Sequence, residues 1–288
     1  MVSRTMSRFD LHRKHPSACL HAVGPDASSI KTLLLSLSTI AGTKISNPPW
    51  AIFQSAGGRF KSAPTEIESR LLFISPRMSN GARVIKAIFF DYDGVLTTDK
   101  TGSLTTNRYL SEASGLEFEL VREAFASFNA DLLIGKTTHT AIWDAVCDSI
   151  GRKLDISLLE QAFLSTPAND AMFALARKLR KRYVVGIITD NKKDRLDCLR
   201  KSQQLDELFS PIIVSAEHKI GKQGPALFEL ALCELRIKPE EAIFVDNTPA
   251  NLVAAKGLGL HTYLHDDEVN DVEGLAAILS NQYDVQFD

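Results

Sequence analysis

The sequence has almost no excess charge, few cysteines and no long apolar run. Its 33 lysines and arginines nearly balance 35 aspartates and glutamates, so the formal net charge of the 288 residues is -2. A dedicated nucleic-acid-binding domain normally has a basic excess, so we expect no nucleic-acid partner. Cysteines occur only at Cys19, Cys147, Cys198 and Cys233, without a Cys-x-x-Cys pair or a zinc-site spacing. We interpret them as reduced thiols of an intracellular protein.

The longest apolar run near the N-terminus is also short. It covers Leu33 to Leu35 and extends through Leu37 and Ile40, but serines and a threonine interrupt it. A helix that crosses a bilayer needs about 20 apolar residues, so we expect neither a membrane-spanning helix nor a membrane partner. The rest of the composition, 44% hydrophobic and 24% charged, is typical of a globular protein and excludes wholesale disorder.

Residues 1–77 differ in charge from the rest of the chain. They contain 10 basic and 4 acidic residues, which leaves 23 basic and 31 acidic residues for 78–288. Serine, arginine and histidine are frequent there and periodicity is absent, so we predict a disordered leader. Three interpretations stay open: an organelle transit peptide, a flexible regulatory tail, or upstream sequence included by a start codon assigned before Met78. The expected location is the cytoplasm, or an organelle if the leader is a transit peptide.

From Val84 onward, short apolar runs alternate with helical stretches. The runs lack polar alternation, which is typical of strands buried on both faces of a parallel sheet; they lie at 84–90, 182–189, 211–214 and 242–245. The predicted helices lie at 170–181, 193–208, 225–235 and 250–258. This order predicts an α/β fold with a doubly wound parallel sheet.

The connection between the first two predicted strands is too long for a simple crossover. It covers residues 101–169 and includes stretches at 117–128 and 140–149 whose apolar residues recur at helical spacing. We therefore predict a small helical cap at 101–169, inserted into a core formed by 84–100 and 170–288.

Two acids, Asp91 and Asp93, follow the first predicted strand, and Gly94 permits a sharp turn after them. Ligands of open α/β sheets bind at the carboxyl ends of the strands. Carboxylates this close repel each other unless a cation offsets their charge, and Mg²⁺ prefers such oxygen ligands. The competing interpretation is that both acids cap an ordinary turn, which Asp often does.

The ends of the later strands supply further polar residues. The second run ends in Thr189-Asp190-Asn191, Gly221-Lys222 lies after the third, and the fourth ends in Asp246-Asn247. Together with the segment of Asp91 and Asp93, these make four segments. With the stretch from Ser215 to Phe228 around the third, they resemble the motifs of the haloacid dehalogenase superfamily of aspartate-nucleophile hydrolases, in the same order. The resemblance covers Lys86 to about Asp266.

The resemblance implies a Rossmann-like core and a role for each of these residues. Asp91 would be the nucleophile that forms an aspartyl-phosphate, and Asp93 would be the general acid and base. Thr189 and the backbone amide of Asp190 would bind a phosphoryl oxygen, and Lys222 would offset the negative charge. The Mg²⁺ ligands would be Asp91, Asp93 through its backbone carbonyl, and Asp246, with Asn247 beside them.

The resemblance implies a Mg²⁺-dependent phosphomonoester hydrolase that acts on a small phosphorylated metabolite such as a sugar phosphate. Asp93 favours this reaction, because the dehalogenases of the superfamily lack an acid at that position. A phosphomutase, a dehalogenase and a catalytically idle binding protein remain alternatives, and a phosphate-receiving signalling module is a more distant one. A homodimer is left open.

Overall fold

The computed structural model describes residues 84–287. The predicted leader at 1–77 and Cys19 lie outside the described residues, so the predictions made for them stay predictions. The described residues begin three positions before the first strand.

The core is a sheet of five parallel strands in the order β3-β2-β1-β4-β5. The strands are β1 (Ala87–Phe90), β2 (Val184–Thr189), β3 (Ile212–Val214), β4 (Ala242–Asp246) and β5 (His261–Leu264). In the central register, Phe90 lies beside Ile187 of β2 and Val245 of β4. The doubly wound α/β prediction is confirmed. The first four strands end at, or within one residue of, their predicted carboxyl ends, whereas β5 was not predicted.

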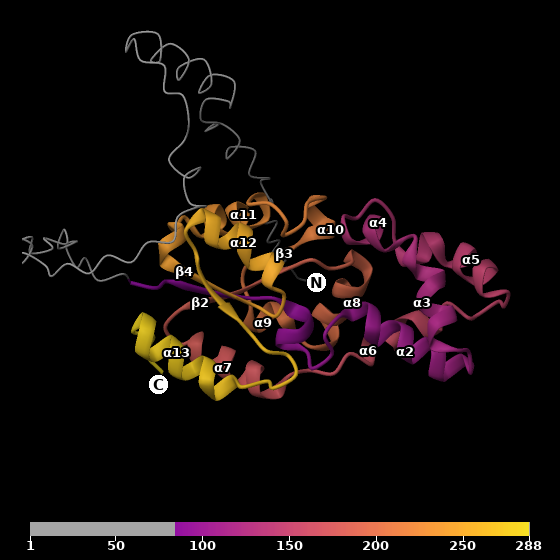
Figure 1. Cartoon of the computed structure of the whole chain (residues 1–288), viewed down its shortest axis with the longest axis horizontal. Helices are drawn as coiled ribbons and strands as arrows, with labels where there is room; N and C mark the ends of the chain where they lie inside the picture. The colour runs from indigo at the N-terminus through magenta and orange to yellow at the C-terminus, as the bar shows by residue number, and fades with distance from the viewer. Residues whose placement is uncertain (1–83, 288) are drawn as a thin grey trace, which may run out of the picture. The chain divides into compact units, whose positions relative to one another are not determined.

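Helices cover both faces of the sheet, as Figure 1 shows for α7 and α13 on one side and α11 and α12 on the other. Ile88 and Phe90 of β1 belong to an apolar cluster with α7 (Asp170–Leu179), α8 (Lys193–Ser202), α9 (Leu205–Leu208) and α13 (Val272–Tyr283). The alternate residue Phe89 belongs to a second cluster with α11 (Ala226–Leu235) and α12 (Pro249–Leu258). The short elements are η2 (Tyr92–Leu96), α10 (Ser215–His218) and η3 (Pro239–Glu241). Burial on both faces explains why the strand residues show no polar alternation.

The prediction of one helix over 193–208 is wrong. The helix α8 ends at Ser202, and Gln204 adopts a left-handed conformation with φ of 52° before α9 begins at Leu205. Leu205 and Phe209 then pack fully buried in the core. Packing of these two side chains outweighs the local helical preference, which is worth only a few tenths of a kcal/mol per residue.

Five helices lie between η2 and α7. They are α2 (Gly102–Ser114), α3 (Phe118–Ala126), α4 (Asn129–Leu133), α5 (His139–Ile150) and α6 (Ser157–Leu164). Their apolar residues form a cluster of their own around Leu110, Val121 and Val146. The helix α6 also packs against α8 of the core. That this segment is a separate cap domain with boundaries at 101 and 169 stays a prediction.

Within residues 84–287, no helix combines the length and the apolar character that a membrane span requires. Cys147 and Cys198 are free thiols.

Candidate functional site

Asp91 lies where β1 ends, at the carboxyl edge of the sheet. Its backbone amide still donates to the carbonyl of Val245 at 2.8 Å, and its Oδ1 accepts a hydrogen bond from the Tyr92 amide at 2.7 Å. The chain then turns through Gly94, whose φ is +75°. A Cβ at Gly94 would lie 2.1 Å from Nδ2 of Asn247, so both the conformation and the packing require glycine. The turn thereby fixes the Asp91 carboxylate at the sheet edge.

Lys222 joins two carboxylates in the interior. Its Nζ lies 2.8 Å from Oδ2 of Asp91 and 2.6 Å from Oδ2 of Asp246, and the lysine is completely buried. Asp246 also accepts hydrogen bonds from the Thr248 amide at 2.7 Å and from Nδ2 of Asn251 at 3.1 Å. One ammonium therefore faces two carboxylates, which leaves this cluster with one uncompensated negative charge.

The excess negative charge shifts the titration of the cluster. Burial raises the pKa of Asp91 to about 7, and the attraction of Lys222 offsets part of this shift. Burial alone would lower the pKa of Lys222, but Asp91 and Asp246 outweigh it and raise that pKa. Because the Asp91 carboxylate is costly to ionise here, a further cation would stabilise its charged form.

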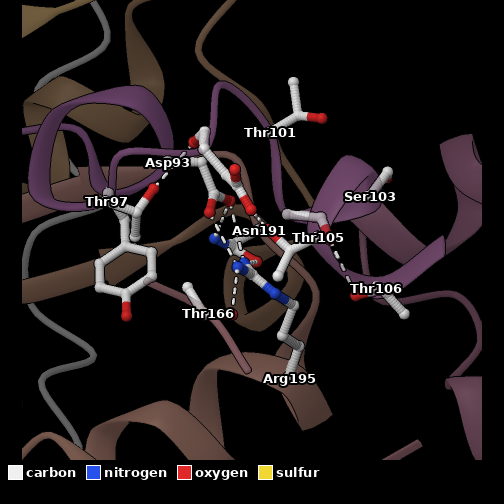
Figure 2. Close-up of polar contacts among 12 residues, drawn as sticks. Asp93, Thr97, Thr101, Ser103, Thr105, Thr106, Thr166, Asn191 and Arg195 are labelled. Atoms are coloured by element: carbon white, nitrogen blue, oxygen red, sulfur yellow. Dashed lines mark hydrogen bonds and ion pairs between the residues drawn. The ribbon is translucent and has the colours of Figure 1, made fainter. Parts of the chain in front are cut away.

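Asp93 forms a two-bonded ion pair with Arg195, which sequence reasoning missed (Figure 2). The two guanidinium nitrogens donate to Oδ2 and Oδ1 of Asp93 at 2.9 and 2.8 Å, and Asn191 Nδ2 donates to Oδ2 at 3.0 Å. Arg195 is completely buried and also donates to Oγ1 of Thr166 at 3.2 Å. A Cβ at Gly102 would lie 2.3 Å from the guanidinium carbon. Arg195 thus contacts Asp93, the start of the inserted helices at Gly102 and their end at Thr166.

Thr189 and Asp190 lie at the end of β2. Thr189 is buried, and its Oγ1 has no hydrogen-bond partner among the described residues. Such an orphaned hydroxyl fits a phosphoryl oxygen as its partner. The Asp190 carboxylate is directed to the Lys222 loop, where it accepts from the Lys222 amide at 3.0 Å and from Gln223 Nε2 at 3.3 Å. Burial raises the pKa of Asp190.

Four of the six predicted site residues line one cavity of about 330 Å³. They are Asp91, Asp93, Asp190 and Lys222. The other two, Thr189 and Asp246, do not line it, although Asp246 contacts Lys222. Further lining residues come from the segment that enters the inserted helices, from α4, from the loop after β2, and from the loop after β4 with the start of α12; they are Lys100, Thr101, Gly102, Ser103, Asn129, Leu133, Asn191, Lys192, Asn247, Thr248 and Asn251. A larger cavity of about 560 Å³ between α6 and α8 contains none of the predicted residues, so the smaller one is the candidate site.

The oxygen donors at the cavity fit a magnesium ion better than a metal that needs three or more carboxylate, histidine or cysteine ligands. No three Asp, Glu, His or Cys side chains of residues 84–287 converge as a ready-made metal site. Asp91, Asp93 and Asn247 line the cavity and are sources of carboxylate, carbonyl and amide oxygens. Mg²⁺ usually takes only one or two carboxylates and completes its shell with water and phosphate.

Sequence reasoning missed Arg195, Lys192 and Asn251. The first of these had a signal, because Arg195 lies in the buried stripe of α8 with Leu196 and Leu199. An arginine on the apolar face of a helix indicates a buried anionic partner. Lys192 and Asn251 had no comparable signal, since both follow motif residues in loops or at helix starts.

Three comparisons place this geometry among known proteins. The sequence profile of the haloacid dehalogenase-like hydrolases matches residues 85–259. The chain is 25% identical to the bifunctional epoxide hydrolase 2 of Rattus norvegicus over 221 residues, 69% of this chain and 40% of that protein. It is 24% identical to the validoxylamine A 7'-phosphate phosphatase of Streptomyces hygroscopicus subsp. limoneus over 195 residues, 64% of this chain and 88% of that protein.

A solved structure shows the same fold. It is a haloacid dehalogenase family enzyme from Bacteroides thetaiotaomicron, with a TM-score of 0.56 and 21% identity, and the match covers 67% of this chain and 98% of that one. The coverage of the relatives is uneven, because the chain spans only about 40% of the length of the rat epoxide hydrolase.

Proposed function

The chain belongs to the haloacid dehalogenase-like hydrolases, and from this premise we propose that it is a magnesium-dependent phosphomonoester hydrolase acting on a small phosphorylated metabolite. The observation that supports this proposal best is the contact of Lys222 with the Asp91 carboxylate at the cavity that Asp93 also lines. The phosphatase name of the Streptomyces relative agrees with it.

In the proposed reaction, an Asp91 carboxylate oxygen attacks phosphorus and the bond from phosphorus to the ester oxygen breaks. The leaving oxygen takes a proton from Asp93, and the phosphoryl group remains on Asp91 as an acyl phosphate. Water then attacks phosphorus, Asp93 accepts its proton, and inorganic phosphate leaves while the Asp91 carboxylate is restored. Lys222 and the orphaned Thr189 hydroxyl would bind the phosphoryl oxygens.

Magnesium would be held by the Asp91 carboxylate, the Asp93 backbone carbonyl and Asp246. Asn247 is a further candidate ligand, since it lines the cavity and Asp246 is occupied by three donors. When bound, Mg²⁺ neutralises phosphoryl oxygens and aligns them for in-line attack. The cluster of Asp91, Asp246 and Lys222 tolerates this cation because it has two carboxylates and one ammonium.

The test of this proposal is turnover of an aryl phosphate by the purified chain. We expect phosphate release in the presence of Mg²⁺, loss of turnover on addition of a chelator, and recovery when Mg²⁺ is restored. Mg²⁺ should also raise the melting temperature, since a ligand at 100 times its Kd stabilises the folded state by about 2.7 kcal/mol. Sodium chloride at matched ionic strength is the control.

The alternatives predict different products in the same assay. A dehalogenase would release chloride from 2-chloropropionate without Mg²⁺, a phosphomutase would return the phosphoryl group to a sugar, and an idle binding protein would show no turnover. Chelator-resistant chloride release with no phosphate release would contradict the proposal.

Arg195 should act as a positioning residue for Asp93. We expect Arg195→Met to lower kcat about 10- to 100-fold with a smaller change in KM, because Asp93 loses its two-bonded partner while the phosphate contacts remain. Steady-state kinetics on the aryl phosphate measure this split. Arg200→Met on the same helix, whose partner Asp206 is exposed, is the matched control. An unchanged kcat in a folded Arg195→Met protein would refute the role.

A further inference from the structure

Lys192 is a buried lysine without a carboxylate partner among the described residues. It lies in the loop between β2 and α8, and only 6% of the residue is exposed. Its Nζ donates to Oγ of Ser103 at 2.5 Å, and no Asp or Glu oxygen of the described residues lies within 4.0 Å. An ammonium has three protons to donate, so two of them face no protein acceptor in the described part of the chain. Lysines are rarely buried unless paired.

Three features of the surroundings oppose a positive charge at this position. Burial lowers the pKa of Lys192 to about 8 and the positive charge of Arg195 adds to the shift, while the more distant charges of Asp93 and Asp194 offset a part of it. Lys192 is also the N-terminal cap residue of α8, the positive end of the helix dipole, and its side chain makes no capping hydrogen bond. Serine, threonine or aspartate would suit this cap better. The fold therefore gains nothing evident from a lysine here.

The lysine instead faces the candidate site. It lines the same cavity as Asp91 and Lys222, on a wall shared with Ser103 and Asn129. Ser103 Oγ in turn lies 3.4 Å from Oδ1 of Asn129, so the serine can donate to Asn129 while it accepts from Lys192. Ser103 is the second residue of α2 and Asn129 begins α4, so this wall joins a core loop to the inserted helices. The two remaining ammonium protons can donate to a group that occupies the cavity.

The ester phosphate itself already has partners in the proposed function. Lys222 contacts Asp91, and in the proposed function the unpartnered Thr189 hydroxyl and the Asp190 amide would bind the phosphoryl oxygens. Lys192 comes two residues after Asp190, beyond Asn191, whose side chain is engaged by Asp93 and Arg195. A second cation on the wall beyond these groups suits a second anionic group better than the same phosphate.

We propose that Lys192, supported by Ser103 and Asn129, forms an anion subsite that binds a second acidic group of the substrate. The substrate is then a small phosphate monoester that also carries a carboxylate or a second phosphate. This inference rests on the proposed function and narrows it from phosphate esters in general to doubly acidic ones. A neutral sugar phosphate would leave the Lys192 charge buried without a partner.

Two matched pairs of substrates test the subsite and distinguish the two sources of the acid. The carboxylate pair is 3-phosphoglycerate and glycerol 3-phosphate, and the phosphate pair is propane-1,3-diol bisphosphate and 3-hydroxypropyl phosphate. Each pair differs in the second acidic group and keeps the ester phosphate. We expect kcat/KM of the native protein to be about 10- to 100-fold higher on the acidic member of one pair, which is the usual range for a hydrogen bond to a charged group.

Substitution of the lysine should remove this preference. Lys192→Gln should reduce the acidic-to-neutral ratio of kcat/KM to about one, and Ser103→Ala should reduce it part of the way. The matched control is Lys193→Gln, the next residue, which is exposed and paired with Asp197 at 2.6 Å, and it should leave the ratio unchanged. Lys192→Gln should not lower the melting temperature of the free protein, because it removes an unpartnered buried charge. If Lys192→Gln does unfold, the acidic-to-neutral ratio of kcat/KM is measured on Ser103→Ala and Lys192→Arg instead.

Several outcomes would overturn the inference. The native protein would prefer neither acidic substrate, or Lys192→Gln would slow both members of a pair equally, which would place the lysine on the transferred phosphate. Failure of the proposed function is a separate result, since it appears as absent turnover of the aryl phosphate. In that case, calorimetric binding of 3-phosphoglycerate and glycerol 3-phosphate to the native protein and to Lys192→Gln still measures the subsite.

Discussion

Asp91→Asn is expected to reduce kcat on an aryl phosphate by about 10⁴-fold or more, because the amide cannot form the covalent intermediate. Asparagine has nearly the same shape, and its single carbonyl oxygen keeps one of the two hydrogen bonds that Asp91 accepts from the Tyr92 amide and from Lys222. Because the shape of the side chain is kept and Lys222 still pairs with Asp246, we expect the loss to be chemical and not structural. Single-turnover and steady-state phosphate release measure it, and Asp197→Asn on the exposed face of α8 is the matched control.

The same substitution should stabilise the free protein. Burial raises the pKa of Asp91 to about 7, well above the value of an unfolded aspartate. The folded state therefore holds this proton more tightly than the unfolded state, and this group's contribution to stability falls as the pH rises from about 4 to about 7. Asparagine has no such dependence. We expect the melting temperature of Asp91→Asn to exceed that of the native protein increasingly over this range, with a constant difference above it.

Magnesium should separate the two effects of Asp91→Asn. The ion should raise the melting temperature of the native protein and have little effect on the variant, which has lost a ligand. Residual turnover above about 1% in Asp91→Asn, still removed by a chelator, would show that another group is the nucleophile. A lower melting temperature of the variant at pH 7 would show that Asp91 stabilises the fold as an ion-pair partner of Lys222.

The catalytic edge could be predicted because its residues are tied to short-range patterns. Asp91, Thr189 and Asp246 each come at the end of a continuous apolar run, and parallel strands bring such ends to one edge. Lys222 lies seven residues after Ser215, within the stretch that resembles a family motif. In the structure Lys222 is buried against Asp91, whereas Lys219 is the left-handed residue that ends α10.

The walls of the cavity could not be predicted in the same way. Arg195 and Lys192 acquire their surroundings only when α8 packs beneath the inserted helices, and their partners Asp93 and Ser103 lie about 100 and 90 residues away in the sequence. The spacing of apolar residues within one helix or strand does not predict contacts between residues so far apart in the sequence. The end of helix α8 at Ser202 was missed for the same reason, since burial of later residues decides it.

Lys222, the partner of Asp91 in the buried ion pair, should have the next largest effect when it is substituted. Lys222→Met should lower kcat by about 10²- to 10³-fold, since it removes a preorganised positive charge beside the nucleophile. It should also lower the free energy of unfolding by about 3–5 kcal/mol at neutral pH, the usual cost of leaving a buried charge without its partner. Denaturant unfolding and steady-state kinetics measure the two losses, and Lys219→Met in the neighbouring loop is the control.

The signs of the two stability changes should be opposite, and this comparison tests the charge count of the site. Asp91→Asn takes the cluster of Asp91, Asp246 and Lys222 from one net negative charge to none, whereas Lys222→Met takes it to two. Lys222 lowers the pKa of Asp91, so its loss raises that pKa above the native value of about 7, and the deficit of Lys222→Met should shrink as the pH is lowered toward about 7. In the native protein the pKa of Lys222 is raised, so the contribution of this lysine is present at neutral pH and is lost only as the pH rises through that pKa. If both substitutions destabilise the protein equally at every pH, the negative charge is balanced by a group outside this cluster, and the case for a bound cation loses its electrostatic basis.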